Sequence, residues 1–183
     1  KSLKNGSNGI KPISLFDTSD FSVNIAGEVR INFEDFFEKH ELNRIDRFTA
    51  MALIAGTEAV EKSKIHSSRI DKNRVGVIIG SGIGGLNTFE EQHIRLLKSP
   101  RRVSPFFIPS MISDIASGHL SIKYGFKGPN YCVVSACATA SHAIGDSLRM
   151  IKYGDADVIV TGGADASITP MAVAGFANMK ALT

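Results

Sequence analysis

The sequence contains no tryptophan and only two cysteines, Cys132 and Cys137. Their spacing fits no metal-binding motif and suits a disulfide poorly, so we expect two reduced thiols and a reducing compartment. The chain also lacks a run of about 18 apolar residues, the length that a transmembrane helix needs. No apolar segment follows the first charged residues, so we expect no signal peptide there. These absences argue against a disulfide-stabilised secreted domain and against a membrane protein.

A strong excess of one charge is missing as well. The formal net charge is +3 over 183 residues, with 43% hydrophobic and 21% charged residues, which are typical values for a globular chain with one good core. No basic stripe is interleaved with aromatic residues, as binding of single-stranded nucleic acid would need. We therefore expect no nucleic-acid partner and at most an acidic protein partner.

The residues around Cys137 change from the pattern of a strand to that of a helix. Residues 131–134, YCVV, form a short apolar run typical of a buried strand. From Ala140 to Ile151, small and apolar residues recur at the spacing of one helical face. Gly154 follows as the predicted C-cap, and residues 158–161 predict another buried strand. The unit reads as strand, helix, strand in a parallel sheet, with Cys137 at the edge where open α/β sheets bind ligands.

This position would suit a nucleophile. The thiolate is the reactive form of cysteine, and the start of a helix favours it by about 1 kcal/mol, which does not suffice without a base or a cation nearby. The free N–H groups there can also hold an oxyanion. An inert buried cysteine is the alternative, and position alone does not decide between the two. We interpret His142 as a packed or capping residue, because it lies roughly 140° around the helix from Cys137.

Further along the chain, the patterns predict a helix over 45–64, a buried strand over 75–79, a helix to about residue 97, a loop over 98–110 and a helix over 111–124. Gly80, Gly82 and Gly85 satisfy the dinucleotide fingerprint, which makes a nucleotide-binding module one alternative. The fingerprint requires an acidic residue about 20 positions later, where this chain has only RVSP. A cysteine hydrolase is another alternative, but its nucleophile turn requires glycines where Ser135 and Thr139 stand.

The segment SACATASHAIGDSLRMIKYGDADVIVTGGADAS resembles the nucleophile region of the β-ketoacyl-acyl carrier protein synthases, the condensing enzymes of fatty-acid synthesis. It is most similar to the elongating type II enzymes. Four further segments match in family order: GSGIGGL, PRRVSPFFIPS, SGHLSIKYGFKGPN and AGFANMKAL. The resemblance implies a thiolase-like α/β fold with a mixed sheet covered by helices. Modular polyketide synthases more often carry a serine-rich run after the cysteine, so a polyketide ketosynthase is the less favoured reading.

The resemblance also implies roles for individual residues. Cys137 would carry the growing acyl chain as a thioester before its condensation with malonyl-acyl carrier protein. The acyl pocket would contain Ile83, Phe107, Ile108 and Phe176, with Phe107 and Ile108 reaching across the interface of a homodimer. The acyl carrier protein would dock on Arg44, Arg101, Arg102 and Lys180. No metal or other cofactor is expected, because the phosphopantetheine arm belongs to the carrier protein.

Compared with this family, we expect residues 1–183 to be the amino-terminal portion of an incomplete ketoacyl synthase domain. The first strand of the family fold is missing, and so is a second half that supplies two catalytic histidines and a lysine. We therefore expect this portion to be inactive and unstable by itself. The family implies a cytoplasmic protein, or a plastid protein in a plastid-bearing eukaryote.

Overall fold

The computed structural model of the protein describes residues 2–66 and 69–182. The chain divides into two compact units. Residues 33–166 form the larger unit, and residues 1–32 form the smaller one together with residues 167–183. The larger unit contains Cys137 and most of the predicted site residues.

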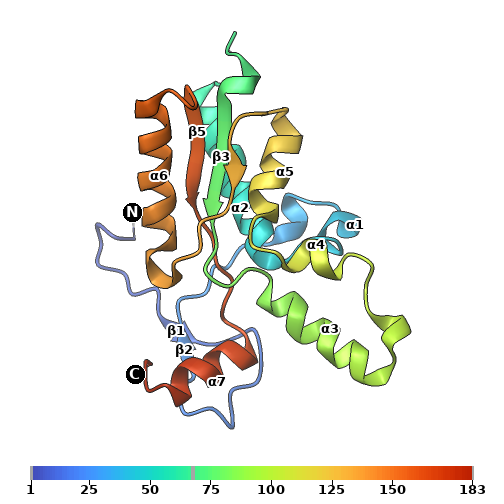
Figure 1. Ribbon diagram of the computed structural model, residues 1–183. Coiled ribbons are helices and arrows are strands. Elements are labelled where there is room, and N and C mark those ends of the chain that lie inside the picture. Colours follow the sequence, from blue (N-terminus) through green and yellow to red (C-terminus); the bar gives the residue numbers. More distant parts are fainter. Residues whose placement is uncertain (1, 67–68, 183) are drawn as a thin grey trace. The chain divides into compact units, whose positions relative to one another are not determined.

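A three-stranded parallel sheet is the centre of the larger unit (Figure 1). It consists of β3 (Val75–Gly80), β4 (Asn130–Tyr131) and β5 (Val158–Gly163), in the order β4-β3-β5. Every residue of β3 is buried, since this strand has a neighbour on each side and helices on both faces. The register places Gly80 beside Gly163, so the carboxyl ends of β3 and β5 coincide.

Helices cover both faces of this sheet (Figure 1). Helices α2 (Arg47–Ser63) and α5 (Ile115–Tyr124) pack on one face, and α6 (Thr139–Tyr153) packs on the other. The main hydrophobic core lies between the sheet and the first two helices. Its most buried members include Phe48, Val60, Val75, Val77, Ala116 and Leu120.

Helix α6 lies very close to the sheet. Its buried residues are Thr139, Ala143 and Ser147, all small, and the sheet has glycines opposite them. A Cβ atom on Gly163 would lie 2.7 Å from Cβ of Ala140, and a Cβ atom on Gly80 would overlap the methyl group of Thr139. The start of α6 can therefore approach the ends of β3 and β5 this closely only because glycines occupy positions 80 and 163.

The apolar stripe predicted for α6 has the right period but is only partly buried. Ile144 and Leu148 are each 53% exposed, and Ile151 is 40% exposed. The small residues of the stripe face the sheet, because the close approach of the helix leaves no room there for larger ones. The left-handed C-cap at Gly154 confirms the predicted end of the helix.

The predicted strand over 131–134 is wrong beyond its first residue. Strand β4 ends at Tyr131, and Val134 is 60% exposed. The chain leaves the edge of the sheet here, and the sulfur of Cys132 accepts a hydrogen bond from the N–H of Ser81 at 3.2 Å. Beyond Tyr131, the Cys132 side chain thus replaces the backbone of β4 as the hydrogen-bond partner of the residue after β3.

The predicted helix over 111–124 is also wrong at its start, because two helices share this region. Three residues separate the end of helix α4 (Phe107–Met111) from the start of α5. The N–H of Gly85 donates a hydrogen bond to the carbonyl of Met111 at 2.9 Å, which takes this carbonyl out of a continuing helix. The predicted loop before it contains part of α4 and the 3-10 turn η3 (Pro100–Arg102), which follows α3 (Leu86–Lys98).

Short elements complete the larger unit. They are η1 (Phe33–Asp35), α1 (Lys39–Leu42), η2 (Lys72–Arg74) and η4 (Ala136–Ala138). Asp46 is almost fully buried and its carboxylate accepts hydrogen bonds from the N–H groups of Phe48 and Thr88, so it fixes the starts of α2 and α3 together.

The smaller unit contains an antiparallel pair of short strands, β1 (Lys11–Pro12) and β2 (Ile25–Ala26), and the helix α7 (Pro170–Asn178). Thr169 caps α7 by accepting a hydrogen bond from the N–H of Ala172. The chain thus has parallel and antiparallel strands in separate sheets with covering helices, and the predicted α/β class is confirmed. Of the helices in the described part of the chain, none is both long and apolar enough to cross a membrane.

The contact between α6 and β3 can be tested with Gly80→Ala. The new methyl group overlaps Thr139, so we expect the free energy of unfolding to fall by about 1–3 kcal/mol. Gly118→Ala in α5 is the matched control, because its methyl group meets open space and should raise helix stability by about 0.5–1 kcal/mol. Urea unfolding of both variants, in the protein expressed from its entire coding sequence, measures the difference. Equal effects of the two substitutions would contradict the proposed close contact.

Candidate active site

Cys137 lies in the turn η4, which leads directly into the 15-residue helix α6. It is exposed. The turn is held by two hydrogen bonds of Ser135, whose N–H donates to Oγ1 of Thr139 at 2.8 Å and whose carbonyl accepts from the N–H of Ala138 at 3.1 Å. The predicted position of the cysteine at the start of a helix is confirmed, but the strand before it already ends at Tyr131.

Ala136, which precedes the cysteine, has a left-handed backbone with φ of +50°. This conformation costs a residue with a side chain about 1–2 kcal/mol, and such strain often marks functional sites. In the nucleophile turn of α/β-hydrolases the strained residue is the nucleophile itself. Here it is the residue before the cysteine, so the geometry differs from that of the hydrolase alternative.

His142 contacts the same turn. Its Nδ1 atom lies 2.7 Å from Oγ of Ser135. This hydrogen bond ties the first turn of α6 to the segment before Cys137. His142 is exposed and its partner is a side chain, so the interpretation as a packed or capping residue is wrong.

The glycine-rich segment after β3 passes beside this turn. A Cβ atom on Gly82 would lie 3.4 Å from the carbonyl oxygen of Ala136. The segment is anchored by Asp165, which follows β5. The carboxylate of Asp165 accepts hydrogen bonds from Oγ of Ser81 at 3.1 Å and from the N–H groups of Gly82 and Ile83, each at 3.3 Å.

This anchoring argues against the nucleotide-binding alternative. In a dinucleotide-binding turn, backbone N–H groups hold the phosphates of the ligand. Here those of Gly82 and Ile83 already bind the Asp165 carboxylate, and that of Gly84 donates to Oγ of Ser81 at 3.0 Å. To bind these N–H groups, a phosphate would have to displace the Asp165 carboxylate, which is negatively charged like the phosphate itself.

The two cysteines differ in their surroundings. Cys132 is partly buried and lies against Ser81. Burial raises the pKa of the Cys132 thiol, and the hydrogen bond from the Ser81 backbone offsets this only in part. Cys132 therefore stays protonated in a structural contact, whereas Cys137 is exposed at the start of a helix.

The residues predicted for the acyl pocket fall into two groups. Ile83 lies in the glycine-rich segment, and Phe107 and Ile108 begin α4, which is bound to that segment through the hydrogen bond between Gly85 and Met111. Phe176 belongs to α7 of the smaller unit.

The predicted docking residues are all exposed. Arg101 and Arg102 form η3 at the end of α3. The guanidinium of Arg44 lies over the ring of Phe106, 4.9 Å from its centroid, so this arginine contacts the residue before α4. Lys180 belongs to the smaller unit.

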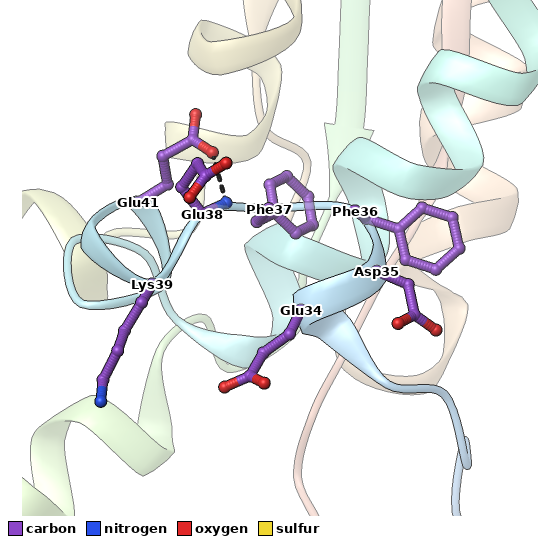
Figure 2. A pocket seen from close by; sticks show the side chains of 7 residues that line it. All are labelled: Glu34, Asp35, Phe36, Phe37, Glu38, Lys39 and Glu41. Atoms are coloured by element: carbon purple, nitrogen blue, oxygen red, sulfur yellow. Dashed lines mark hydrogen bonds between the residues drawn. The ribbon is translucent and has the colours of Figure 1, made fainter.

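A separate hollow is lined by residues 34–39 and 41 (Figure 2). Its acidic groups belong to one continuous segment, in which Glu38 and Glu41 form a capping box at the start of α1. None of the predicted site residues lines it. Within residues 2–66 and 69–182, no three histidine, cysteine or acidic side chains are grouped so that they could hold a metal ion.

The comparison with protein families agrees with the geometry around Cys137. The sequence model described as "Beta-ketoacyl synthase, N-terminal domain" matches residues 1–183. The chain belongs to the β-ketoacyl synthase family. It is 48% identical over 180 residues to the 3-oxoacyl-[acyl-carrier-protein] synthase 2 of Staphylococcus aureus, and this match covers 97% of the chain and 45% of the relative. The chain thus spans less than half the length of such relatives.

Solved ketosynthases share the fold. The ishigamide ketosynthase/chain length factor superposes with a TM-score of 0.88 at 24% identity, over 100% of this chain and 46% of that one. A type II polyketide ketosynthase in complex with its acyl-carrier protein superposes with a TM-score of 0.76 at 21% identity, over 83% of this chain and 44% of that one. The predicted thiolase-like ketosynthase fold is confirmed.

Sequence reasoning missed Asp165 and Ser81 as parts of this site. Both follow the carboxyl ends of neighbouring parallel strands, the fully buried β3 and the mostly half-buried β5, where functional side chains of α/β proteins gather. The position of Asp165 shortly after the predicted strand over 158–161 was the available signal. The local sequence pattern could not show that this strand, β5, pairs with β3 and so brings Asp165 to Ser81.

The difference between the thiols can be tested by alkylation. Iodoacetamide reacts with thiolates, so Cys137 should be modified about tenfold faster than Cys132 at pH 8, because Cys132 is partly buried and its raised pKa keeps it protonated. Peptide mass spectrometry of the natural, folded protein gives both rates. Alkylation of Cys132 should become appreciable only at a pH above the ordinary pKa of a cysteine thiol, because the pKa of Cys132 is raised. Equal rates in the folded protein would contradict the assignment.

Proposed function

We propose that the protein containing this chain is an elongating β-ketoacyl-acyl carrier protein synthase, an acyltransferase of fatty-acid synthesis. The observation that carries this proposal is the exposed Cys137 in a strained turn at the start of α6. Its relatives of known name are 3-oxoacyl-[acyl-carrier-protein] synthases. We also propose that residues 1–183 form the amino-terminal portion of one ketoacyl synthase domain.

In the first step, the Cys137 thiolate attacks the thioester carbonyl of an acyl-carrier substrate. The bond between carbonyl carbon and pantetheine sulfur breaks, the pantetheine leaves as a thiolate, and the acyl group remains on Cys137 as a new thioester. The N–H of Cys137, at the positive end of α6, is the proposed donor to the transient oxyanion.

In the second step, malonyl-acyl carrier protein loses carbon dioxide. The electron pair left on its α-carbon attacks the acyl carbonyl, a carbon–carbon bond forms, and Cys137 leaves as thiolate. The product is a β-ketoacyl chain two carbons longer, still bound to the carrier protein. The family resemblance assigns the decarboxylation to two histidines and a lysine outside residues 1–183.

Exposed apolar side chains support the proposed acyl pocket. Ile83 is 42% exposed, Ile108 is 55% exposed and Phe176 is 38% exposed. Exposed apolar groups commonly bind an apolar ligand or a partner. We propose that Ile83, Phe107, Ile108 and Phe176 line the acyl channel.

A homodimer is proposed from the free edge of the sheet. Strand β5 is at the edge of the sheet, and within the described part of the chain no further strand pairs with it. An uncharged edge strand is a template for pairing with a second copy. Phe107 and Ile108 would then reach the acyl channel of the neighbouring subunit.

The carrier-protein surface is proposed to include Arg44, Arg101, Arg102 and Lys180. All four are exposed, and acyl carrier proteins present acidic helices that such cations attract. A ketosynthase of the same fold is known in complex with its acyl-carrier protein. The phosphopantetheine arm of that partner would deliver the thioester, without a further cofactor.

A polyketide ketosynthase is the second candidate. The solved structures of similar fold include a type II polyketide ketosynthase, but at 21% identity it supports the fold alone. The 48% identity to a 3-oxoacyl-[acyl-carrier-protein] synthase 2 favours fatty-acid elongation. Assays with saturated acyl chains and with polyketide intermediates distinguish the two candidates.

The nucleophile is tested with Cys137→Ala in the complete protein. Wild type incubated with acyl-acyl carrier protein should gain the mass of one acyl group, and the variant should gain none, because no sulfur is left to form the thioester. Condensation activity should fall to background. Circular dichroism serves as the control for folding, and Cys132→Ala should still form the adduct. An acyl adduct on the Cys137→Ala protein would refute the assignment.

The docking surface is tested with the double substitution Arg101→Glu and Arg102→Glu. Replacing two positive charges by two negative ones should repel the acidic carrier protein and raise its apparent KM about tenfold at low salt. Since exposed charges are screened beyond about 10 Å at 0.1 M salt, the difference from wild type should shrink as salt rises.

A small acyl-pantetheine thioester is the internal control for this experiment. It carries no acidic protein, so it should load Cys137 of the double variant at nearly the wild-type rate. If both substrates lose activity to the same extent, the arginines support the fold of η3 and do not dock a carrier protein.

A further inference from the structure

The carboxylate of Asp165 ties together two parts of the sheet edge that lie far apart in the sequence. It follows β5 and binds the segment after β3 through three donors, Oγ of Ser81 and the N–H groups of Gly82 and Ile83. Ser81 is fully buried, and its Oγ also accepts a hydrogen bond from the N–H of Gly84. One exposed carboxylate thus organises the whole turn between β3 and α3.

Ile83 is held from both sides by this arrangement. Its own N–H binds Asp165 at 3.3 Å, and two residues later the N–H of Gly85 binds the carbonyl of Met111 at 2.9 Å. A Cβ atom on Gly85 would lie 2.5 Å from the carbonyl oxygen of Ser110, so the turn lies directly against α4. The contact with α4 consists of backbone atoms, whereas the contact with β5 depends on one side chain.

We propose that Asp165 is a positioning residue that fixes Ile83 at the acyl channel and so determines which acyl-chain lengths the enzyme accepts. Asp165 would touch neither the acyl chain nor the thioester, and would act through the backbone of Gly82 and Ile83. This inference rests on the function proposed above and adds a residue to it.

The chemistry of the three donors explains why a carboxylate is needed. An ionised carboxylate has two oxygens and accepts several hydrogen bonds at once, and bonds to an ionised acceptor are stronger than neutral ones. An asparagine of nearly the same shape offers one acceptor oxygen and turns its NH2 group toward other donors. With its oxygen at the Oδ1 position, the asparagine of Asp165→Asn still accepts from Ser81 and Ile83, but the N–H of Gly82, which binds Oδ2, loses its partner with little change in volume.

The experiment compares hexanoyl and tetradecanoyl thioesters of pantetheine with wild type and with Asp165→Asn, in the complete protein. We expect the ratio of kcat/KM for the two chain lengths to move toward unity by about three- to tenfold, because Gly82 loses its anchor and the adjacent Ile83 no longer holds one position at the channel. Loading of the hexanoyl group on Cys137 should stay within about twofold of wild type. Asp165→Glu keeps the carboxylate and should restore most of the selectivity.

Asp157→Asn is the matched control, since it removes a carboxylate just before the amino end of the same strand. There the Asp157 carboxylate accepts a hydrogen bond from Arg74 at 2.7 Å, so this variant also loses a charged contact of the sheet. It should leave the chain-length ratio unchanged. If Asp157→Asn alters the ratio as much as Asp165→Asn does, or if Asp165→Asn slows both chain lengths alike, Asp165 only supports the fold and the inference is wrong.

A double-mutant cycle tests the route through the turn. Ser81→Ala removes a donor to Asp165 and the acceptor for Gly84. If both residues act through one hydrogen-bond network, the effects of Ser81→Ala and Asp165→Asn on the chain-length ratio are not additive. Additive effects would show that Asp165 does not act through this turn, which would overturn the inference.

The wild-type reaction separates this inference from the function on which it rests. A wild-type protein that forms no acyl adduct on Cys137 and no condensation product refutes the proposed function, and the inference with it. A wild type that condenses both substrates, while Asp165→Asn keeps its chain-length ratio, refutes only the role of Asp165.

Discussion

The close approach of α6 to the carboxyl ends of β3 and β5 is the constraint on which the rest of the site depends. Gly80 and Gly163 leave no room for side chains, so the first turn of the helix lies directly on the two strand ends. Cys137 precedes that turn and is therefore fixed at the edge of the sheet. The glycine-rich segment after β3 leaves the sheet at the same place, which is why it passes beside the nucleophile turn.

At the same edge of the sheet, backbone and side-chain hydrogen bonds have different roles in positioning the segments around Cys137. Backbone hydrogen bonds within η4 and between Gly85 and Met111 set the course of the chain. Side chains then join segments that the backbone does not connect, as Thr139 and His142 do around Ser135 and as Asp165 does across the sheet edge. A substitution can remove the second kind of contact without altering the first.

Local sequence patterns predicted the elements in which they are strong. The alanine-rich stripe of α2, the buried run of β3 and the helix after Cys137 all form, and the place of the cysteine follows from them. The break between α4 and α5 could not be predicted, because it depends on a contact with Gly85 far away in the sequence. The anchoring by Asp165 was missed for the same reason: it exists only once β5 pairs with β3.

The pairing of β3 with β5 has a consequence for how the chain is made. Arg74 and Asp157, which bind each other beside these two strands, are 83 positions apart. At about 5–20 residues per second, a ribosome needs roughly 4–17 s to synthesise that stretch. Until residues 130–131 emerge, the uncharged strand β3 lacks both neighbours, and until residue 158 emerges it still lacks β5; an unpaired apolar strand is prone to associate with other chains. The nascent chain is thus prone to associate through β3 before residue 158 emerges.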